Sequence, residues 1–223
     1  MANASLIERT PWDCAALGHD AFQLANAGEE ALAQVGAPGH YTVKVDPLAP
    51  KDGLQRNGFY YCDTLIEPHC SAARMEPRHH EAAGFDRRPS LEPLLAACHG
   101  AFQHGRFHRD FNVERRVADL RYENWLRALH AAGKVYGLTW NGESAGFIAC
   151  EGGKLVLHAL GEQHRGRGFA KYWWSAVCAD LVRNGASELT SSVSAANVAA
   201  LSLYASLGFR FRNAIDVYHR VIP

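Results

Sequence analysis

The chain has 223 residues, enough to bury a substantial core as one large domain or two small ones. Its 23 Lys and Arg residues balance its 23 Asp and Glu residues, so no overall field would attract nucleic acid or an anionic membrane surface. No apolar run reaches the length of a membrane span, and the opening MANASLIERTPWDC lacks the basic and apolar regions of a secretory signal. We therefore expect neither nucleic acid nor membrane as a partner.

Residues 1–68 predict a small α/β unit of short alternating elements. The expected strands cover residues 19–25, 40–46 and 59–67, and the expected helices cover 28–35 and the stretch that ends at Gly58.

Residues 69–105 are predicted to form a linker or loop region. The part from 69 to 89 is polar, is interrupted by proline and shows no periodicity. Whether residues 69–89 form a lid over a site stays open at this point.

Residues 106–223 predict a second, complete domain. A helix is expected over 112–133, with Asn112 as its N-cap and Gly133 at its end. The order that follows is strands at 134–140, 144–150 and 154–160, a helix at 168–184, a strand at 188–193, a helix at 197–208 and a strand at 209–221. This order predicts a mixed α/β (α+β) fold and excludes an all-β protein or a helix bundle.

The cysteines and histidines carry little sign of a special site. The six cysteines, at 14, 62, 70, 98, 150 and 178, form no CxxC pair, which is typical of reduced thiols in a cytoplasmic protein. The 12 histidines include the pair His79–His80, but no HExxH pattern and no close group of ligands is present. The sequence therefore predicts no metal site.

A glycine- and arginine-rich turn separates the strand at 154–160 from the next helix. The string RGRGFA begins at Arg165. Unpaired backbone N–H groups at a helix start, glycines that allow close approach and fixed positive charges together suit a phosphate or pyrophosphate. The dinucleotide pattern G-x-G-x-x-G fails because Lys171 replaces the third glycine, and the P-loop ending GK[ST] is also missing.

Two strings resemble signatures of the GNAT acetyltransferases. RGRGFA resembles the Q/R-x-x-G-x-G/A turn that wraps the pyrophosphate of coenzyme A, and NVAALSLYASLGF, starting at Asn197, resembles the N-x-x-A-x-x-x-Y-x-x-x-G-F pattern. The resemblance covers residues 112–220. It implies a mostly antiparallel sheet with flanking helices, and acetyl-CoA as cosubstrate.

The N-terminal part carries a second resemblance. PWDCAALGHDAF and LQRNGFYYCDTLI, with GRFHRDF and ADLRYENW, look like the two-part architecture of the dTDP-fucosamine acetyltransferase group. In that group a reduced GNAT-like half precedes a complete one, so residues 1–68 are expected to be such a half.

The GNAT resemblance implies which residues hold the cosubstrate. The strand at 154–160 should part from its neighbour at 188–193, so that backbone groups of Ala159 and Leu160 hold the pantetheine arm and the thioester carbonyl. The pyrophosphate cradle would consist of Arg165, Gly166, Arg167, Gly168, Phe169 and Ala170. Both arginines could instead face solvent, and Asn197 could cap a helix, contact the pantetheine amide, or do both.

Two residues are candidates for catalysis. Tyr204 lies two helical turns beyond Asn197 on the same face and is protonated at neutral pH, which suits a general acid for the leaving thiolate. His158 shares one face of its strand with Leu160, and an imidazole suits a general base for an ammonium. The alternatives are a core tyrosine and a buried structural histidine.

The acceptor is expected to meet Arg106, Asp110, Tyr122 and Trp125, with Asp110 holding an ammonium and Arg106 a diphosphate. The function predicted is N-acetylation of a primary amine on a small molecule, such as a nucleotide-linked amino sugar. Other acceptors are a protein N-terminus, an amino acid or a polyamine. A non-catalytic acyl-CoA sensor is the alternative from a different class, and either protein could form a homodimer.

Overall fold

The computed structural model describes residues 5–223, which divide into two compact units. Unit 1 takes the described residues up to Leu65 together with His104–Arg121 and Ala214–Pro223, whereas unit 2 takes Ile66–Gln103 and Tyr122–Asn213. The sequence predicted that the chain divides after residues 68 and 105. The two units follow other boundaries, because each unit combines segments that are far apart in the sequence.

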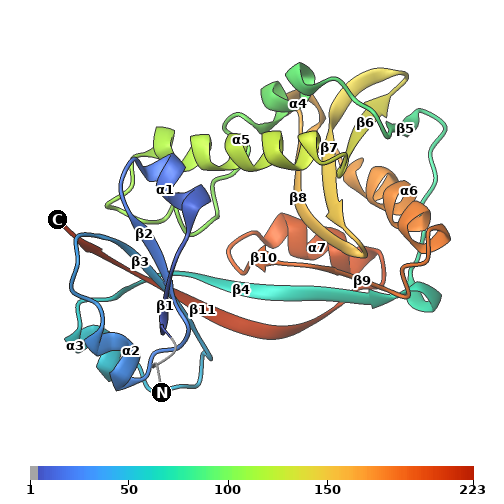
Figure 1. Ribbon diagram of the computed structural model, residues 1–223. Coiled ribbons are helices and arrows are strands. Elements are labelled where there is room, and N and C mark those ends of the chain that lie inside the picture. The colour runs from blue at the N-terminus through green and yellow to red at the C-terminus, as the bar shows by residue number, and fades with distance from the viewer. Residues whose placement is uncertain (1–4) are drawn as a thin grey trace. The chain divides into compact units, whose positions relative to one another are not determined.

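Unit 1 is built on a mixed sheet in the order β1-β2-β3-β11-β4. Its strands are β1 (Ile7–Arg9), β2 (Ala21–Leu24), β3 (Gly39–Val45), the last part of β11 (Arg210–Ile222) and the first part of β4 (Tyr60–Ser71). Its short helices are α1 (Pro11–Leu17), α2 (Glu29–Ala33) and α3 (Asp52–Arg56). Strands β2 and β3 pair in parallel and β3 and β11 pair antiparallel, so the blue strand β3 and the dark red strand β11 lie side by side (Figure 1).

Unit 2 is built on strands in the order β4-β9-β8-β7-β6-β5, with β10 on β4. The strands are β5 (Ala83–Asp86), β6 (Val135–Trp140), β7 (Glu143–Glu151), β8 (Lys154–Leu160), β9 (Glu188–Ser191) and β10 (Val193–Ser194). The helices are α4 (Leu91–Cys98), α5 (Arg115–Ala131), which starts in unit 1, α6 (Ala170–Arg183) and α7 (Val198–Ser206), with 3-10 turns at Ala72–Arg74 and Glu162–His164.

Helices cover both faces of the unit 2 sheet (Figure 1). Side chains alternate along β7, so Phe147 packs with α4 and α5 while Ile148 packs with α6 and α7. This explains why six consecutive residues of β7, from 145 to 150, are buried. Within unit 2, β4 pairs antiparallel with β9, β5 with β6, β6 with β7 and β7 with β8, whereas β8 and β9 pair in parallel.

The segment 69–105 contains ordered structure that its composition does not reveal. It completes β4, forms β5 against β6, and then forms α4. The irregular stretch between β4 and β5 is fastened to the helices, since the N–H of Arg78 donates to Ser175 Oγ at 2.8 Å and the N–H of Glu76 donates to the Leu207 carbonyl at 3.0 Å. These bonds make the stretch part of unit 2.

One predicted cap is wrong. Helix α5 begins at Arg115, so Asn112 lies outside it. The side chain of Asn112 donates to the Tyr60 hydroxyl at 2.8 Å, and this contact from another part of unit 1 replaces the expected local cap. Gly133 does end the helix region, with a φ of 66°.

Among residues 5–223, no helix combines the length and the apolar character that crossing a bilayer requires. None of the six cysteines in this part of the chain forms a disulfide bond.

Candidate active site

Strands β8 and β9 run in parallel and then separate. Their register pairs only Lys154 with Thr190 and Leu155 with Ser191. Strand β9 ends at Ser191, whereas β8 continues to Leu160 along its other neighbour, β7. Beyond Leu155 the backbone of β8 therefore has no ladder with β9, and this is the parting that the resemblance implies for Ala159 and Leu160.

The last residues of β8 are held in place by a close approach to β7. Gly146 lies opposite Leu160 in the register and has a φ of 147°. A Cβ atom at this position would lie 2.3 Å from the Ala159 carbonyl oxygen and 2.8 Å from the Leu160 Cα. Only a glycine lets the two backbones meet here, so Gly146 fixes the course of the last residues of β8.

The glycine turn connects β8 to the start of α6. Gly166 has a φ of 70° and Gly168 a φ of 71°, and no atom lies within 4 Å of a Cβ built on either residue. Both glycines and Arg167 are exposed. Because the first N–H groups of a helix carry the positive end of its dipole, this open turn ahead of Ala170 has the form of an anion cradle.

The two predicted cradle arginines differ in their surroundings. The Arg165 guanidinium donates from Nε to the Leu160 carbonyl at 2.8 Å and from Nη2 to the Ala97 carbonyl at 3.2 Å. It therefore ties the turn to β8 and to α4. The exposed Arg167 is the better placed of the two to meet an anion. Phe169 stacks on Trp140 with ring centroids 4.5 Å apart, so its side chain packs against the protein.

Asn197 caps helix α7 as the sequence predicts. Its Oδ1 accepts a hydrogen bond from the N–H of Ala200 at 3.0 Å. Gly208 ends the region after this helix with a φ of 85°, and a Cβ there would lie 2.6 Å from the Arg74 carbonyl oxygen. The glycine of the second motif is thus required by the backbone, which explains its place in the pattern without any ligand.

Tyr204 and His158 meet although 46 residues separate them. The Tyr204 hydroxyl lies 3.1 Å from His158 Nε2. Helix α7 supplies the tyrosine, which is fully buried, and β8 supplies the histidine, which is partly buried and packs edge-on against Trp174. The structure therefore joins the two predicted catalytic residues at the point where β8 leaves β9.

Burial shifts the acidity of both groups toward their neutral forms. It lowers the pKa of His158 to about 4 and raises the pKa of Tyr204 above its ordinary value. At neutral pH the pair is an uncharged imidazole beside an uncharged phenol. The neutral ring can accept a proton at Nε2, and the phenol can give one up to a stronger base such as a thiolate.

The depressed pKa of His158 makes stability depend on pH. Its folded pKa of about 4 lies below the ordinary 6.5, so protonation favours the unfolded chain. The stabilising contribution is complete above pH 6.5 and is lost as the pH falls toward 4, at up to about 1.4 kcal/mol per pH unit. Denaturant unfolding of the wild type and His158→Gln between these pH values should show a shallower slope in the variant. Equal pH dependence of the unfolding free energy in the wild type and the variant would contradict the lowered pKa of His158.

The predicted acceptor residues fall into both units. Asp110 and Arg106 belong to unit 1, whereas Tyr122 and Trp125 belong to unit 2. Tyr122 stacks on Phe102 at 4.1 Å, and 37% of Trp125 is exposed.

Asp110 lies in the interior of unit 1. Its Oδ1 accepts hydrogen bonds from the Tyr60 hydroxyl and the Asn112 N–H, and its Oδ2 lies within 2.9 Å of ring nitrogens of His40 and His219. With four partners already present, this carboxylate could hold a substrate ammonium only by displacing one of them.

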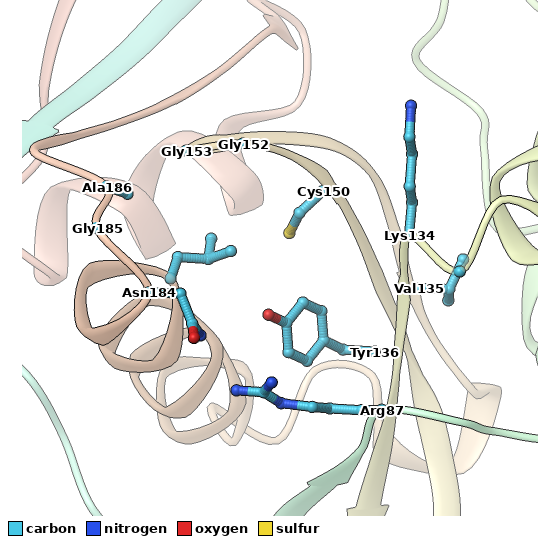
Figure 2. Close-up of a pocket in the computed structure, with 12 residues that line it drawn as sticks. Arg87, Lys134, Val135, Tyr136, Cys150, Gly152, Gly153, Asn184, Gly185 and Ala186 are labelled. Carbon is cyan, nitrogen blue, oxygen red and sulfur yellow. The ribbon is translucent and has the colours of Figure 1, made fainter.

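A separate pocket lies at the other end of α6 (Figure 2). It has a volume of about 530 Å³ and is lined by residues that include Arg87, Tyr136, Cys150 and Asn184. Arg87 and Tyr136 point toward α6, where both hydrogen-bond to Asp180. These bonds attach β6 and the end of β5 to the helix. The pocket contains none of the predicted site residues, and we assign it no part in catalysis.

Comparisons with known proteins identify the fold. A family model described as FR47-like protein matches residues 139–221, from the end of β6 through β11. None of the curated proteins matches. A GCN5-related N-acetyltransferase (GNAT) from Sphaerobacter thermophilus superposes on 83% of the chain with a TM-score of 0.58 and 14% identity. The chain has the GNAT fold.

Other GNAT structures agree with this fold. A putative acetyltransferase of the GNAT family from Novosphingobium aromaticivorans covers 98% of the chain, which spans 89% of that protein, at TM-score 0.55 and 18% identity. A tandem GNAT protein from the clavulanic acid biosynthesis pathway covers 82% of the chain, which spans 64% of it, at TM-score 0.51 and 12% identity. The chain spans only 60% of the Sphaerobacter protein. The expected mixed, mostly antiparallel GNAT sheet with flanking helices is confirmed.

Proposed function

We propose that the protein transfers an acetyl group from acetyl-CoA to a primary amine of a small molecule. The observation that carries the proposal is the contact between Tyr204 and His158 at the parting of β8 and β9, with the glycine turn of α6 next along the chain. A pyrophosphate in that turn would direct the pantetheine arm along the unpaired edge of β8, so that backbone groups of Ala159 and Leu160 hold the thioester. Asn197, at the start of α7, would contact its amide.

The Tyr204–His158 pair provides a route for the protons of the reaction. The amine nitrogen bonds to the thioester carbon and the carbon–sulfur bond breaks. His158 Nε2 takes the proton that the nitrogen loses, and the Tyr204 hydroxyl protonates the departing thiolate. Transfer from His158 to Tyr204 across their 3.1 Å contact then restores both groups. A histidine with a pKa of about 4 is a weak base, which suits an attacking nitrogen that has already become acidic in the intermediate.

For the acceptor we propose an amino sugar carried on a nucleotide. Support comes from the resemblance of the N-terminal segments to the dTDP-fucosamine acetyltransferase group. A protein N-terminus, an amino acid and a polyamine are the other amines to test.

An assay of thiol release separates the enzyme from a non-catalytic acyl-CoA sensor. The protein is mixed with acetyl-CoA and a panel of amines that includes nucleotide-linked amino sugars, amino acids, polyamines and peptides. We expect free coenzyme A to appear with at least one amine. Thermal stabilisation by acetyl-CoA without release on any amine would instead identify the sensor.

A single substitution tests the cradle. Replacing Gly168 by Ala puts a side chain at a φ of 71°, so the turn must change shape although no neighbour blocks the Cβ. We expect the affinity for coenzyme A to fall by about 10-fold, as measured by calorimetry, because strain of about 1–3 kcal/mol is relieved by moving the N–H groups.

Gly152→Ala is the matched control. Gly152 has a φ of 57°, is equally open, and lies in the turn between β7 and β8 at the far end of these strands. It should lower stability by a similar amount and leave coenzyme A binding unchanged. Wild-type affinity in Gly168→Ala would remove the turn from the proposed site.

A further inference from the structure

Two histidines and an aspartate from distant parts of the chain meet inside unit 1. His219 on β11 pairs directly with Thr42 on β3. His40 lies two residues before Thr42, so the alternation of β3 puts both rings on the same face of adjacent strands. The ring centroids are 4.5 Å apart. Asp110 reaches this face from the segment before α5, and all three side chains are 2% exposed or less.

The carboxylate of Asp110 is oriented toward the rings. Its Oδ2 lies 2.9 Å from His40 Nε2 and 2.7 Å from His219 Nδ1. Its Oδ1 is fixed from behind by the Tyr60 hydroxyl and the Asn112 N–H. One carboxylate oxygen thus faces two imidazoles while the other is anchored by outer donors, which is how proteins orient metal-binding carboxylates.

One atom of this group is not accounted for by hydrogen bonding. Nε2 of His219 is buried and has no hydrogen-bond partner among the described residues. Nε2 lies on the side of the ring away from Asp110, so a metal held by all three residues would bind Nδ1, the nitrogen that faces the carboxylate, in exchange for any proton it carries.

We propose that His40, Asp110 and His219 form a binding site for a divalent transition metal, with Zn²⁺ as the favoured ion. One ligand atom from each residue lies within 4.8 Å of the other two. Ligands around a tetrahedral Zn²⁺ are about 3.3 Å apart, so contacts of 2.7 and 2.9 Å need only a small widening to admit the ion.

The ligand set selects the class of metal. Two imidazole nitrogens and one carboxylate oxygen suit Zn²⁺ and its first-row neighbours, whereas Mg²⁺ and Ca²⁺ prefer sites made of oxygens alone. The bound ion would link β3, β11 and the segment before α5. The site lies within unit 1 and does not depend on the proposed acetyl transfer. Sequence spacing hides it, because 70 residues separate His40 from Asp110 and 109 separate Asp110 from His219.

Metal content is the direct test. Because the group is buried, the protein is expressed in zinc-supplemented medium and purified without a metal-affinity tag or chelator. We expect elemental analysis to find about one zinc per chain, and removal by a strong chelator to lower the melting temperature until Zn²⁺, but not Mg²⁺, restores it. Wild-type protein that carries no zinc, and that takes up none after chelator treatment, would overturn the proposal.

Two variants remove a ligand while keeping the hydrogen bond to Asp110. His40→Gln and His219→Asn place an amide N–H near Nε2 and Nδ1 respectively, so the fold should survive. Their zinc affinity should fall by about 100-fold or more, which exceeds most effects of outer partners. His19→Gln, at an exposed position in unit 1, is the matched control and should bind zinc like the wild type. Variants that bind as tightly as the wild type would place the metal elsewhere.

Cobalt substitution distinguishes this site from the cysteines of the chain. Co²⁺ bound by nitrogen and oxygen gives visible bands without the intense near-ultraviolet absorption of a cobalt–thiolate bond. We expect that spectrum in the wild type and its loss in His219→Asn. A thiolate band, or no band, would contradict the assignment.

Discussion

Replacing Tyr204 by Phe is expected to lower turnover with acetyl-CoA by about 100-fold, while the affinity for acetyl-CoA changes little. The variant keeps the ring that packs in the core but loses the hydroxyl that would protonate the thiolate, and general acid catalysis contributes about 10²–10⁴-fold. Steady-state turnover on the best amine of the panel, with calorimetry for acetyl-CoA, measures both quantities. An unchanged rate would show that Tyr204 is only a core tyrosine.

A double-mutant cycle tests whether Tyr204 and His158 act as one unit. His158→Gln alone should also reduce turnover, by about 10–100-fold, because the amide cannot take up a proton. If the proton passes between the two side chains, the double variant should be no slower than the slower single variant. If the fold-reductions in turnover of the two single variants multiply in the double variant, the two groups act separately. A pH–rate profile unchanged by His158→Gln would exclude the histidine as the base.

The second large effect is expected at Gly146. Replacing it by Ala should lower the free energy of unfolding by about 3 kcal/mol or more, since the new methyl group would lie 2.3 Å from a backbone oxygen that cannot move without breaking the pairing of β7 with β8. Denaturant unfolding followed by circular dichroism measures the loss. Because relieving the clash would also displace Ala159 and Leu160, the folded fraction of the variant should bind acetyl-CoA more weakly than the wild type.

Gly142→Ala provides the comparison for this prediction. Gly142 also has a positive φ, of 85°, but no atom lies within 4 Å of its Cβ position. It carries the conformational strain without the clash, so it should lose only about 1–3 kcal/mol. Equal losses in the two variants would mean that the close approach at Gly146 has no special effect.

Motifs and periodicity predicted unit 2 well, because its signals are local. The hairpin turns, the Asn197 cap and the seven-residue spacing to Tyr204 follow from neighbouring residues. Strand alternation also predicted that His158 shares one face of its strand with Leu160. The short elements β5 and α4 were missed; β5 has only four residues and is defined by its pairing with β6.

The features that the sequence did not predict depend on contacts between residues that are far apart in the chain. Asp110 was expected to hold the ammonium of a substrate, yet two histidines from separate strands lie against its carboxylate. Asn112 was expected to cap a helix but instead donates to Tyr60. The lowered pKa of His158 likewise depends on burial between α7 and Trp174. No spacing rule relates such partners.

The interleaved make-up of unit 1 has a consequence for protein synthesis. Strand β3 borders β11, so residues 39–45 stay without that neighbour until the ribosome has translated residues 216–222. The first 65 residues cannot finish folding as they emerge, and chaperones have a long interval in which to bind them. A stalled or prematurely terminated chain would expose this unfinished edge and would be an early target for proteolysis.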